Sequence, residues 1–108
     1  MRRSLPLAVL AAALATSVAQ AAPDVVASIK PVHSLVAAVM EGVGEPRLLV
    51  TGNASPHTYS LRPSDAGALQ NADIVFWTGH GMELFLADAL DTLSINAEVV
   101  ELAHTPGV

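Results

Sequence analysis

Four histidines are the residues of this sequence best suited to bind a metal ion. They are His33, His57, His80 and His104, and they recur about every 24 residues. Neutral imidazole is a common ligand of transition metals, and zinc takes tetrahedral nitrogen and oxygen donors at about 2.0 to 2.2 Å. The chain has no cysteine, so histidine, carboxylate or water would have to supply the donors. The spacing also equals the length of one strand–helix unit, and polar residues favour loops, so it does not by itself define a metal site.

Short apolar runs that alternate with helical patterns must position these histidines. The runs are rich in β-branched residues, too short for helices and not strictly alternating, as expected of strands buried on both faces. Between them, apolar residues recur at helical spacing over 32–43 and 82–93, and more weakly after Pro63-Ser64-Asp65. The predicted strands are Val25 to Ile29, Arg47 to Val50, Asp73 to Trp77 and Glu98 to Leu102.

This alternation predicts an α/β fold, an open parallel sheet with helices on both faces in the order βαβαβαβ. Each histidine follows one predicted strand, and the carboxyl ends of parallel strands share one edge, where open α/β folds bind their ligands. Four strands about 4.8 Å apart span roughly 14 Å, however, so four imidazoles cannot meet one ion without help from the loops. A site shared by all four is therefore the less favoured interpretation.

Residues 1–21 have the pattern of a secretory signal peptide. A basic pair precedes an uncharged apolar run, Leu5 to Val18, and Ala19-Gln20-Ala21 forms an A-x-A cleavage site. The run is shorter than the about 20 residues that an ordinary membrane span needs. We therefore expect cleavage before Ala22 and a periplasmic lobe of residues 22–108 without stable membrane insertion.

The charge of this lobe argues against nucleic acid as a partner. Lys30, Arg47 and Arg62 stand against ten acidic residues, which gives a net charge of −7. Such a balance repels nucleic acid and anionic lipid and attracts cations, although acidic surfaces are common.

His57 differs from the other histidines in its surroundings. It lies in a long loop with two prolines, Gly52-Asn53-Ala54-Ser55-Pro56-His57-Thr58-Tyr59-Ser60-Leu61-Arg62-Pro63-Ser64-Asp65. This loop resembles the P-H-x-Y-x-L-x-P-S-D signature of the metal-binding substrate-binding proteins of ABC importers (cluster A-I). The segment Ser28–Leu35, and Gln70–Trp77 with the residues after it, resemble the same family. The likeness covers nearly all of residues 24–103.

Within that family the resemblance is to the zinc-uptake type. It implies two α/β lobes joined by a rigid helix, with the metal held in the cleft between them. It also implies that His57 is a metal ligand, the one ligand position that this chain carries. Pro56 stands where some zinc-type members have an acidic residue, which removes a possible oxygen donor. The remaining ligands and the second lobe would lie beyond Val108, and since the chain stops just after its fourth strand, we expect a truncated amino-terminal lobe.

The function implied by the resemblance is capture of zinc, as transported substrate, for an ABC-importer membrane permease. A manganese-type binding protein or a metal-independent adhesin fragment of the same fold is the alternative. An enzyme is not favoured, because Leu84 stands where the glycine-rich pattern begun by Gly79-His80-Gly81 needs its last glycine. No G-x-S-x-G motif or phosphate-binding loop occurs either.

The other residues that could do chemistry have simpler interpretations. His33 and His80 are expected beside the cleft or merely exposed, and His104 in a disordered end. We expect Glu83 at the start of the third helix, where a carboxylate favours the positive end of the helix dipole. Trp77 and Phe85 are expected in the core.

Overall fold

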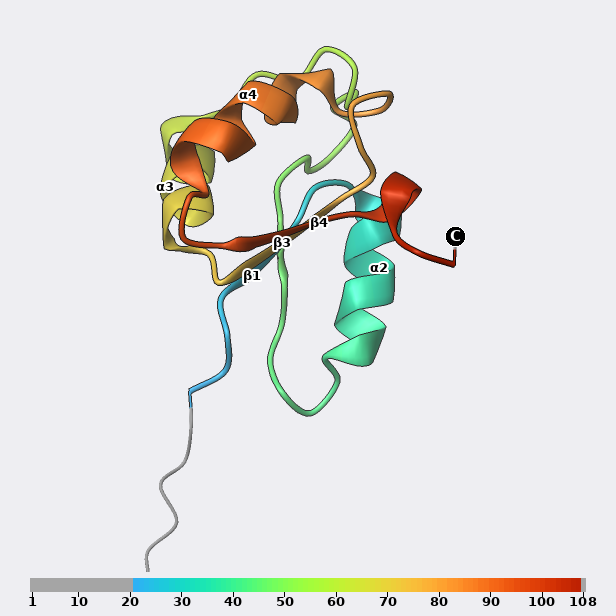
Figure 1. Ribbon diagram of the computed structural model, residues 1–108, viewed down its shortest axis with the longest axis vertical. Coiled ribbons are helices and arrows are strands. Elements are labelled where there is room, and N and C mark those ends of the chain that lie inside the picture. The colour runs from blue at the N-terminus through green and yellow to red at the C-terminus, as the bar shows by residue number, and fades with distance from the viewer. Residues whose placement is uncertain (1–20, 108) are drawn as a thin grey trace, which may run out of the picture.

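Residues 21–107, which the computed structural model describes, form a four-stranded parallel sheet with helices on both faces (Figure 1). The elements are β1 (Val25–Ala27), α2 (Lys30–Val39), β2 (Arg47–Leu48), α3 (Pro63–Asn71), β3 (Ile74–Trp77), α4 (Leu84–Leu93), β4 (Glu98–Glu101) and the 3-10 helix η1 (Leu102–His104). The strands lie in the order β2-β1-β3-β4, and every neighbouring pair is parallel. The predicted α/β fold is therefore confirmed.

The register of the strands divides the core into two layers. On one face Val26 of β1 lies beside Val75 of β3, and these residues pack against α3 and α4. On the other face Val25 and Ala27 pack against α2. Figure 1 shows α3 and α4 together on one side of the strands and α2 on the opposite side. Residues buried in the first layer include Leu49, Leu69, Trp77, Leu86 and Leu90.

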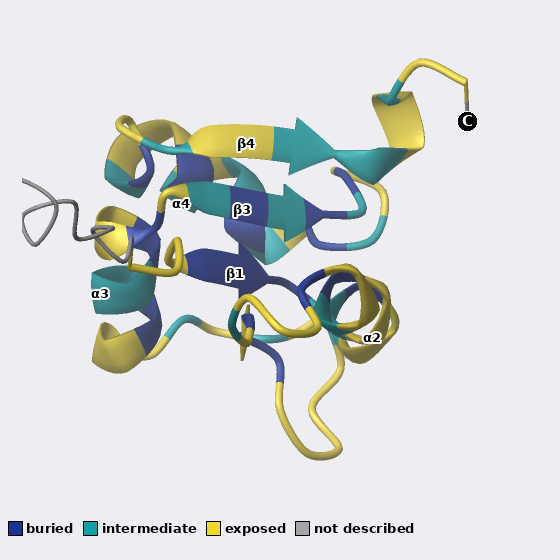
Figure 2. Ribbon diagram, turned by 90° about the horizontal axis from the view of Figure 1, so that it is seen from below, coloured by how far each residue is buried: buried dark blue, intermediate teal, exposed yellow. Residues whose placement is uncertain are grey.

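The sheet is covered unevenly. The central strand β1 is buried along its length, whereas β4 forms an edge whose first half is exposed (Figure 2). Ile74 and Phe76 of β3 face the α2 side but are only partly buried, because α2 packs chiefly over β1 and β2. An edge strand and a half-covered face leave this lobe with apolar surface that is still open to solvent.

The ends of the helices follow from local sequence. Pro31 stands in the first turn of α2, where its missing N–H costs no helical bond, and Gly42 takes a positive φ of 83° just after that helix. Helix α3 begins at Pro63, as predicted. Helix α4 begins at Leu84, two residues later than predicted, because Met82 and Glu83 form a turn whose amides donate to the Gly79 carbonyl.

Within residues 21–107, no helix has both the length and the apolar character needed to cross a membrane. The expected signal peptide lies outside the described residues, apart from Ala21 at its end.

Candidate metal site

His57 lies in the loop of residues 51–62, here called the His57 loop, which leaves the carboxyl end of β2 and leads into α3. The side chain of His57 is exposed. The backbone N–H of His57 donates to Ser55 Oγ at 3.2 Å, and the N–H of Thr58 donates to the Ser55 carbonyl at 3.3 Å. Within residues 21–107, neither ring nitrogen of His57 is engaged in a hydrogen bond, so the imidazole is presented to solvent with both nitrogens available.

A hydrogen-bonded cluster two residues further on fixes the His57 loop to the body of the lobe. The hydroxyl of Tyr59 donates to Asp65 Oδ2 at 2.6 Å and is 3.3 Å from the Leu49 carbonyl. The edge of the Tyr59 ring meets Phe85 of α4 with the ring centroids 5.2 Å apart. These contacts join the residue just after β2 to α3 and α4, so the position of the loop is set by three parts of the fold rather than by its prolines alone.

Asp65 is the centre of this cluster. It is fully buried, and besides Tyr59 it binds three groups of Arg62: the backbone N–H at 2.9 Å, Nε at 3.1 Å and Nη2 at 3.0 Å. Arg47 at the start of β2 adds a second cation at 3.8 Å. The bond to the backbone N–H of Arg62, the residue before α3, also caps the helix, and the carboxylate lies near the positive end of its dipole.

These contacts shift the pKa values of the cluster. Burial alone would raise the pKa of Asp65, but the hydrogen bonds from Arg62 and Tyr59 outweigh it and hold the pKa below its usual value. Burial, with the neighbouring carboxylate of Asp65, raises the pKa of Tyr59. At neutral pH the cluster therefore consists of an ionised Asp65, a neutral Tyr59 hydroxyl that donates, and a charged Arg62.

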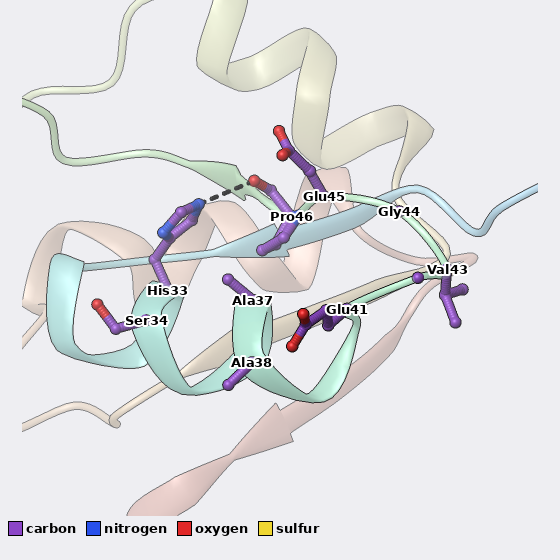
Figure 3. Close-up of a pocket in the computed structure, with 10 residues that line it drawn as sticks. His33, Ser34, Ala37, Ala38, Glu41, Val43, Gly44, Glu45 and Pro46 are labelled. Carbon is purple, nitrogen blue, oxygen red and sulfur yellow. Dashed lines mark hydrogen bonds between the residues drawn. The ribbon is translucent and has the colours of Figure 1, made fainter.

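The side chain of His33 is held away from the His57 loop. It lies in the first half of α2, and its Nε2 donates to the carbonyl of Pro46 at 3.0 Å (Figure 3). Pro46 immediately precedes β2 and therefore marks the amino end of that strand, opposite to the edge from which the His57 loop leaves. The helix turns the ring of His33 back along the sheet, and its expected place beside a cleft between two lobes stays a prediction.

His80 and His104 are brought together, although not with His57. Nδ1 of His104 bonds to Oε1 of Glu101, and Nδ1 of His80 is 3.7 Å from the same oxygen. His104 lies in η1, so the expected disorder at this point is not observed. Across residues 21–107, however, no three histidine, aspartate or glutamate side chains are arranged so that they could hold a metal ion. A site shared by the four histidines is therefore not formed within this lobe.

The remaining expectations concern Glu83 and two aromatic residues. Glu83 is fully buried, and its carboxylate accepts hydrogen bonds from the backbone N–H groups of Thr78 (3.0 and 3.1 Å) and Gly79 (3.3 Å). Its role is structural, as predicted, but it closes the loop before α4 instead of capping the helix with its side chain. Trp77 is buried in the core, and Phe85 is partly buried against it.

The sequence interpretation did not single out the anchors of the site, Tyr59 and Arg62, or the carboxylate of Glu101. A signal for Arg62 was present, since an aspartate at the third position of a helix is a recognised partner for the residue before that helix, but this signal does not concern Tyr59. For Glu101 no such local signal exists, because the partners of its side chain come from different turns and are set by the order of the strands.

The described residues thus form an open parallel α/β layer with a histidine-bearing loop at the carboxyl edge of its sheet. The profile of the ZnuA family, described as zinc-uptake complex component A periplasmic, matches residues 25–108, and the chain belongs to this family. The family is thus that of a transport component and not of an enzyme, and the resemblance seen in the sequence is confirmed.

Curated relatives agree with this assignment. The chain is 49% identical over 104 residues to the high-affinity zinc uptake system protein ZnuA of Brucella abortus strain 2308, covering 96% of this chain and 31% of the relative. It is 43% identical over 93 residues to the protein of the same name from Haemophilus ducreyi, covering 86% and 29%. The chain therefore spans about a third of the length of these relatives.

Solved structures show the same fold. The Zn(II)-bound ZnuA-like domain of Streptococcus pneumoniae AdcA matches with a TM-score of 0.69 at 22% identity, over 80% of this chain and 34% of that chain. The periplasmic zinc-binding protein TroA from Treponema pallidum matches with a TM-score of 0.67 at 26% identity, over 81% and 31%. A Mn-bound periplasmic metal-binding protein from Candidatus Liberibacter asiaticus also matches, with a TM-score of 0.66 at 19% identity over 77% and 32%.

Proposed function

We propose that this chain is the amino-terminal lobe of an exported protein that captures zinc and delivers it to an ABC-importer permease, and that His57 supplies one zinc ligand. The observation that carries the proposal is the placement of His57. Its imidazole is exposed on a loop at the carboxyl edge of the sheet, and Tyr59 and Asp65 anchor that loop only two and eight residues away. The names of the curated relatives and the zinc-bound structures support the choice of function.

The geometry explains how such a ligand would work. An imidazole binds a metal only when it is neutral, so zinc and protons compete for the His57 ring. Because the loop backbone is already held by the Tyr59–Asp65 bond, little ordering of the chain accompanies binding, and ordering one residue would otherwise cost roughly 1 kcal/mol or more. Zinc requires about four donors, so the rest of its ligands must come from outside residues 21–107 or from water.

Zinc is preferred over manganese for a chemical reason. Imidazole-rich sites favour zinc, whereas manganese favours carboxylate and other oxygen donors. Pro56, directly before His57, supplies no oxygen from its side chain. A likeness to a manganese-bound protein at 19% identity concerns the fold and does not alter this argument.

Export is the second part of the proposal. The family is described as periplasmic, and the basic, apolar and A-x-A segments of residues 1–21 would direct the chain there with cleavage before Ala22. A cleaved chain would meet its membrane permease from the periplasmic side.

Alanine variants of the histidines in the full-length protein, assayed by competition with a chromogenic zinc chelator, test the ligand assignment. His57→Ala should weaken zinc binding on the order of 100-fold, since one of about four ligands is lost. The matched variants His33→Ala and His80→Ala should change it by less than about 3-fold. Equal losses in all three variants, or none for His57→Ala, would contradict the role given to His57.

A further inference from the structure

A second group of ionisable side chains, separate from the His57 loop, lies at the carboxyl ends of β3 and β4. Oε1 of Glu101 accepts a hydrogen bond from Nδ1 of His104 and lies 3.7 Å from Nδ1 of His80. The Glu101 side chain is 23% exposed, whereas those of His80 and His104 are 65% and 77% exposed. Two solvent-accessible imidazoles therefore point one nitrogen each at a single oxygen of a side chain that is itself mostly buried.

The three side chains come from segments that are also joined by their backbones. The loop of residues 78–83, here called the β3–α4 loop, carries His80, and its Thr78 carbonyl accepts the N–H of Ala103 in η1 at 3.0 Å. Gly79 in this loop approaches Glu101 so closely that a β-carbon there would lie 2.9 Å from Oε1. The carboxylate is thus enclosed between the loop and η1, and any change in its ionic bonds acts on both.

The surroundings contain few other groups that titrate. A hollow of about 300 Å³ at this point is lined by Thr78, Gly79, His80, Gly81, Met82, Glu101, Ala103 and His104, so Glu101 and the two histidines are its ionisable members. Glu83 lies behind the loop, buried, with its carboxylate on the Thr78 and Gly79 amides. Among residues 21–107, no lysine or arginine lines this hollow to compete for Glu101.

We propose that Glu101, His80 and His104 form a pH-sensitive tether that holds the β3–α4 loop to η1 more tightly in mildly acidic solution than at neutral pH. In model peptides glutamate ionises near pH 4.3 and histidine near pH 6.5. A protonated imidazole forms an ion pair with an ionised carboxylate, whereas a neutral imidazole does not. The two charge pairs therefore belong to mildly acidic solution, and the ionic part of the tether weakens as the imidazoles lose their protons.

The residues of the β3–α4 loop also lie next to Trp77 and to the His57 loop. The His80 ring lies 5.0 Å from the ring of Trp77, tilted by 56°, so a protonated His80 is attracted to the indole. Met82, at the other end of the loop, lines a hollow that is also lined by Pro56 and Ala54 of the His57 loop. Fixing the β3–α4 loop in acid would therefore stiffen a neighbour of the His57 loop. The proposal rests on this geometry and does not depend on His57 being a metal ligand.

Amide hydrogen exchange at Ala103 in the full-length protein tests the tether, because this N–H bridges the two segments. After correction for intrinsic rates, Glu101→Gln should reduce the protection of Ala103 by about 2- to 5-fold at pH 5.5, the range expected for exposed ion pairs, and by clearly less at pH 8. Glu98→Gln, on the same strand and also removing one carboxylate, should change it at neither pH. An equal effect of Glu101→Gln at both pH values would overturn the proposal.

His80 is tested separately through Trp77, the one tryptophan of this 108-residue sequence. Protonated imidazole quenches a neighbouring indole, so the fluorescence of Trp77 should fall between pH 8 and 5.5 in the parent chain and in His33→Gln, but not in His80→Gln. If Glu101→Gln does not fold, His104→Gln removes a single pair and should still lower Ala103 protection at pH 5.5. A quenching transition that persists in His80→Gln would also overturn the proposal.

Discussion

Replacing Asp65 with alanine should destabilise the lobe more than any exposed charge change. The carboxylate is fully buried and accepts four hydrogen bonds, one from Tyr59 and three from Arg62. Alanine leaves the Tyr59 hydroxyl with only the Leu49 carbonyl at 3.3 Å as partner, and it leaves the first turn of α3 without its cap.

The expected loss in the free energy of unfolding follows from these hydrogen bonds. Loss of the cap to the Arg62 backbone is worth about 1 kcal/mol, and loss of the bond between the Tyr59 hydroxyl and a buried carboxylate about 1.5 to 2 kcal/mol. The Arg62 side chain is half exposed at 51%, so water can replace the lost carboxylate there and we add nothing for it. Asp65→Ala should therefore lower the free energy of unfolding by about 3 kcal/mol.

Urea unfolding at pH 7, with linear extrapolation to water, measures this difference. Asp88→Ala is the matched control, since Asp88 is an exposed aspartate of α4 and its replacement should change the free energy of unfolding by less than about 0.5 kcal/mol. A loss below about 1 kcal/mol for Asp65→Ala would refute the view that this residue anchors the His57 loop.

The destabilisation caused by Asp65→Ala should depend on pH. The pKa of Asp65 is lowered in the folded lobe, mainly because bonds from Arg62 and Tyr59 outweigh the effect of burial. The Asp65 carboxylate then stabilises the folded lobe fully at pH values above its pKa in the unfolded chain, which is about 3.9. This stabilisation is lost as the pH falls further towards the pKa in the folded lobe. The difference in the free energy of unfolding between the parent and Asp65→Ala should accordingly be constant from pH 5 to 7 and shrink below about pH 4.

Three further predictions concern the loop before α4, the core and the amino terminus. Glu83→Gln should cost about 1 to 2 kcal/mol in urea unfolding, because a neutral amide oxygen replaces the carboxylate that accepts from the Thr78 and Gly79 amides; an unchanged midpoint would speak against that role. Leu69→Ala, at a fully buried position, should cost about 2 to 5 kcal/mol, and a loss under 1 kcal/mol would mean that α3 is not packed as described. Mass spectrometry of exported protein should find Ala22 at the amino terminus, whereas an intact segment 1–21 would exclude cleavage there.

The order and type of the elements could be predicted because they depend on local pattern. Short β-branched runs and apolar residues at helical spacing are sufficient to define a parallel α/β layer. Strand β2 shows the limit of this approach. It is assigned only to Arg47–Leu48, but the amides of Leu49 and Val50 continue the ladder by donating to Ala27 and Ser28, as the predicted strand Arg47 to Val50 requires.

The contacts that hold the candidate site could be predicted only in part. The loop sequence directed attention to His57 and its prolines, but the Tyr59 hydroxyl reaches Asp65 and the Leu49 carbonyl, and the second contact depends on where β2 ends. The pairing of Glu101 with His80 needs β4 to lie beside β3, and residue spacing does not specify which strands are neighbours. Side-chain partners that come from separate strands therefore cannot be predicted from local sequence pattern.

The most direct test of the account is to observe the ring nitrogens of His57 by ¹⁵N NMR in the full-length protein, with and without one equivalent of zinc. A zinc-bound imidazole cannot take up a proton, so the His57 signals should shift on addition of zinc and then stay constant between pH 8 and 6. His33, bonded to the Pro46 carbonyl, should keep the same signals with and without zinc. His57 signals that are unchanged by zinc, while the metal is bound elsewhere, would contradict the assignment of His57 as a ligand.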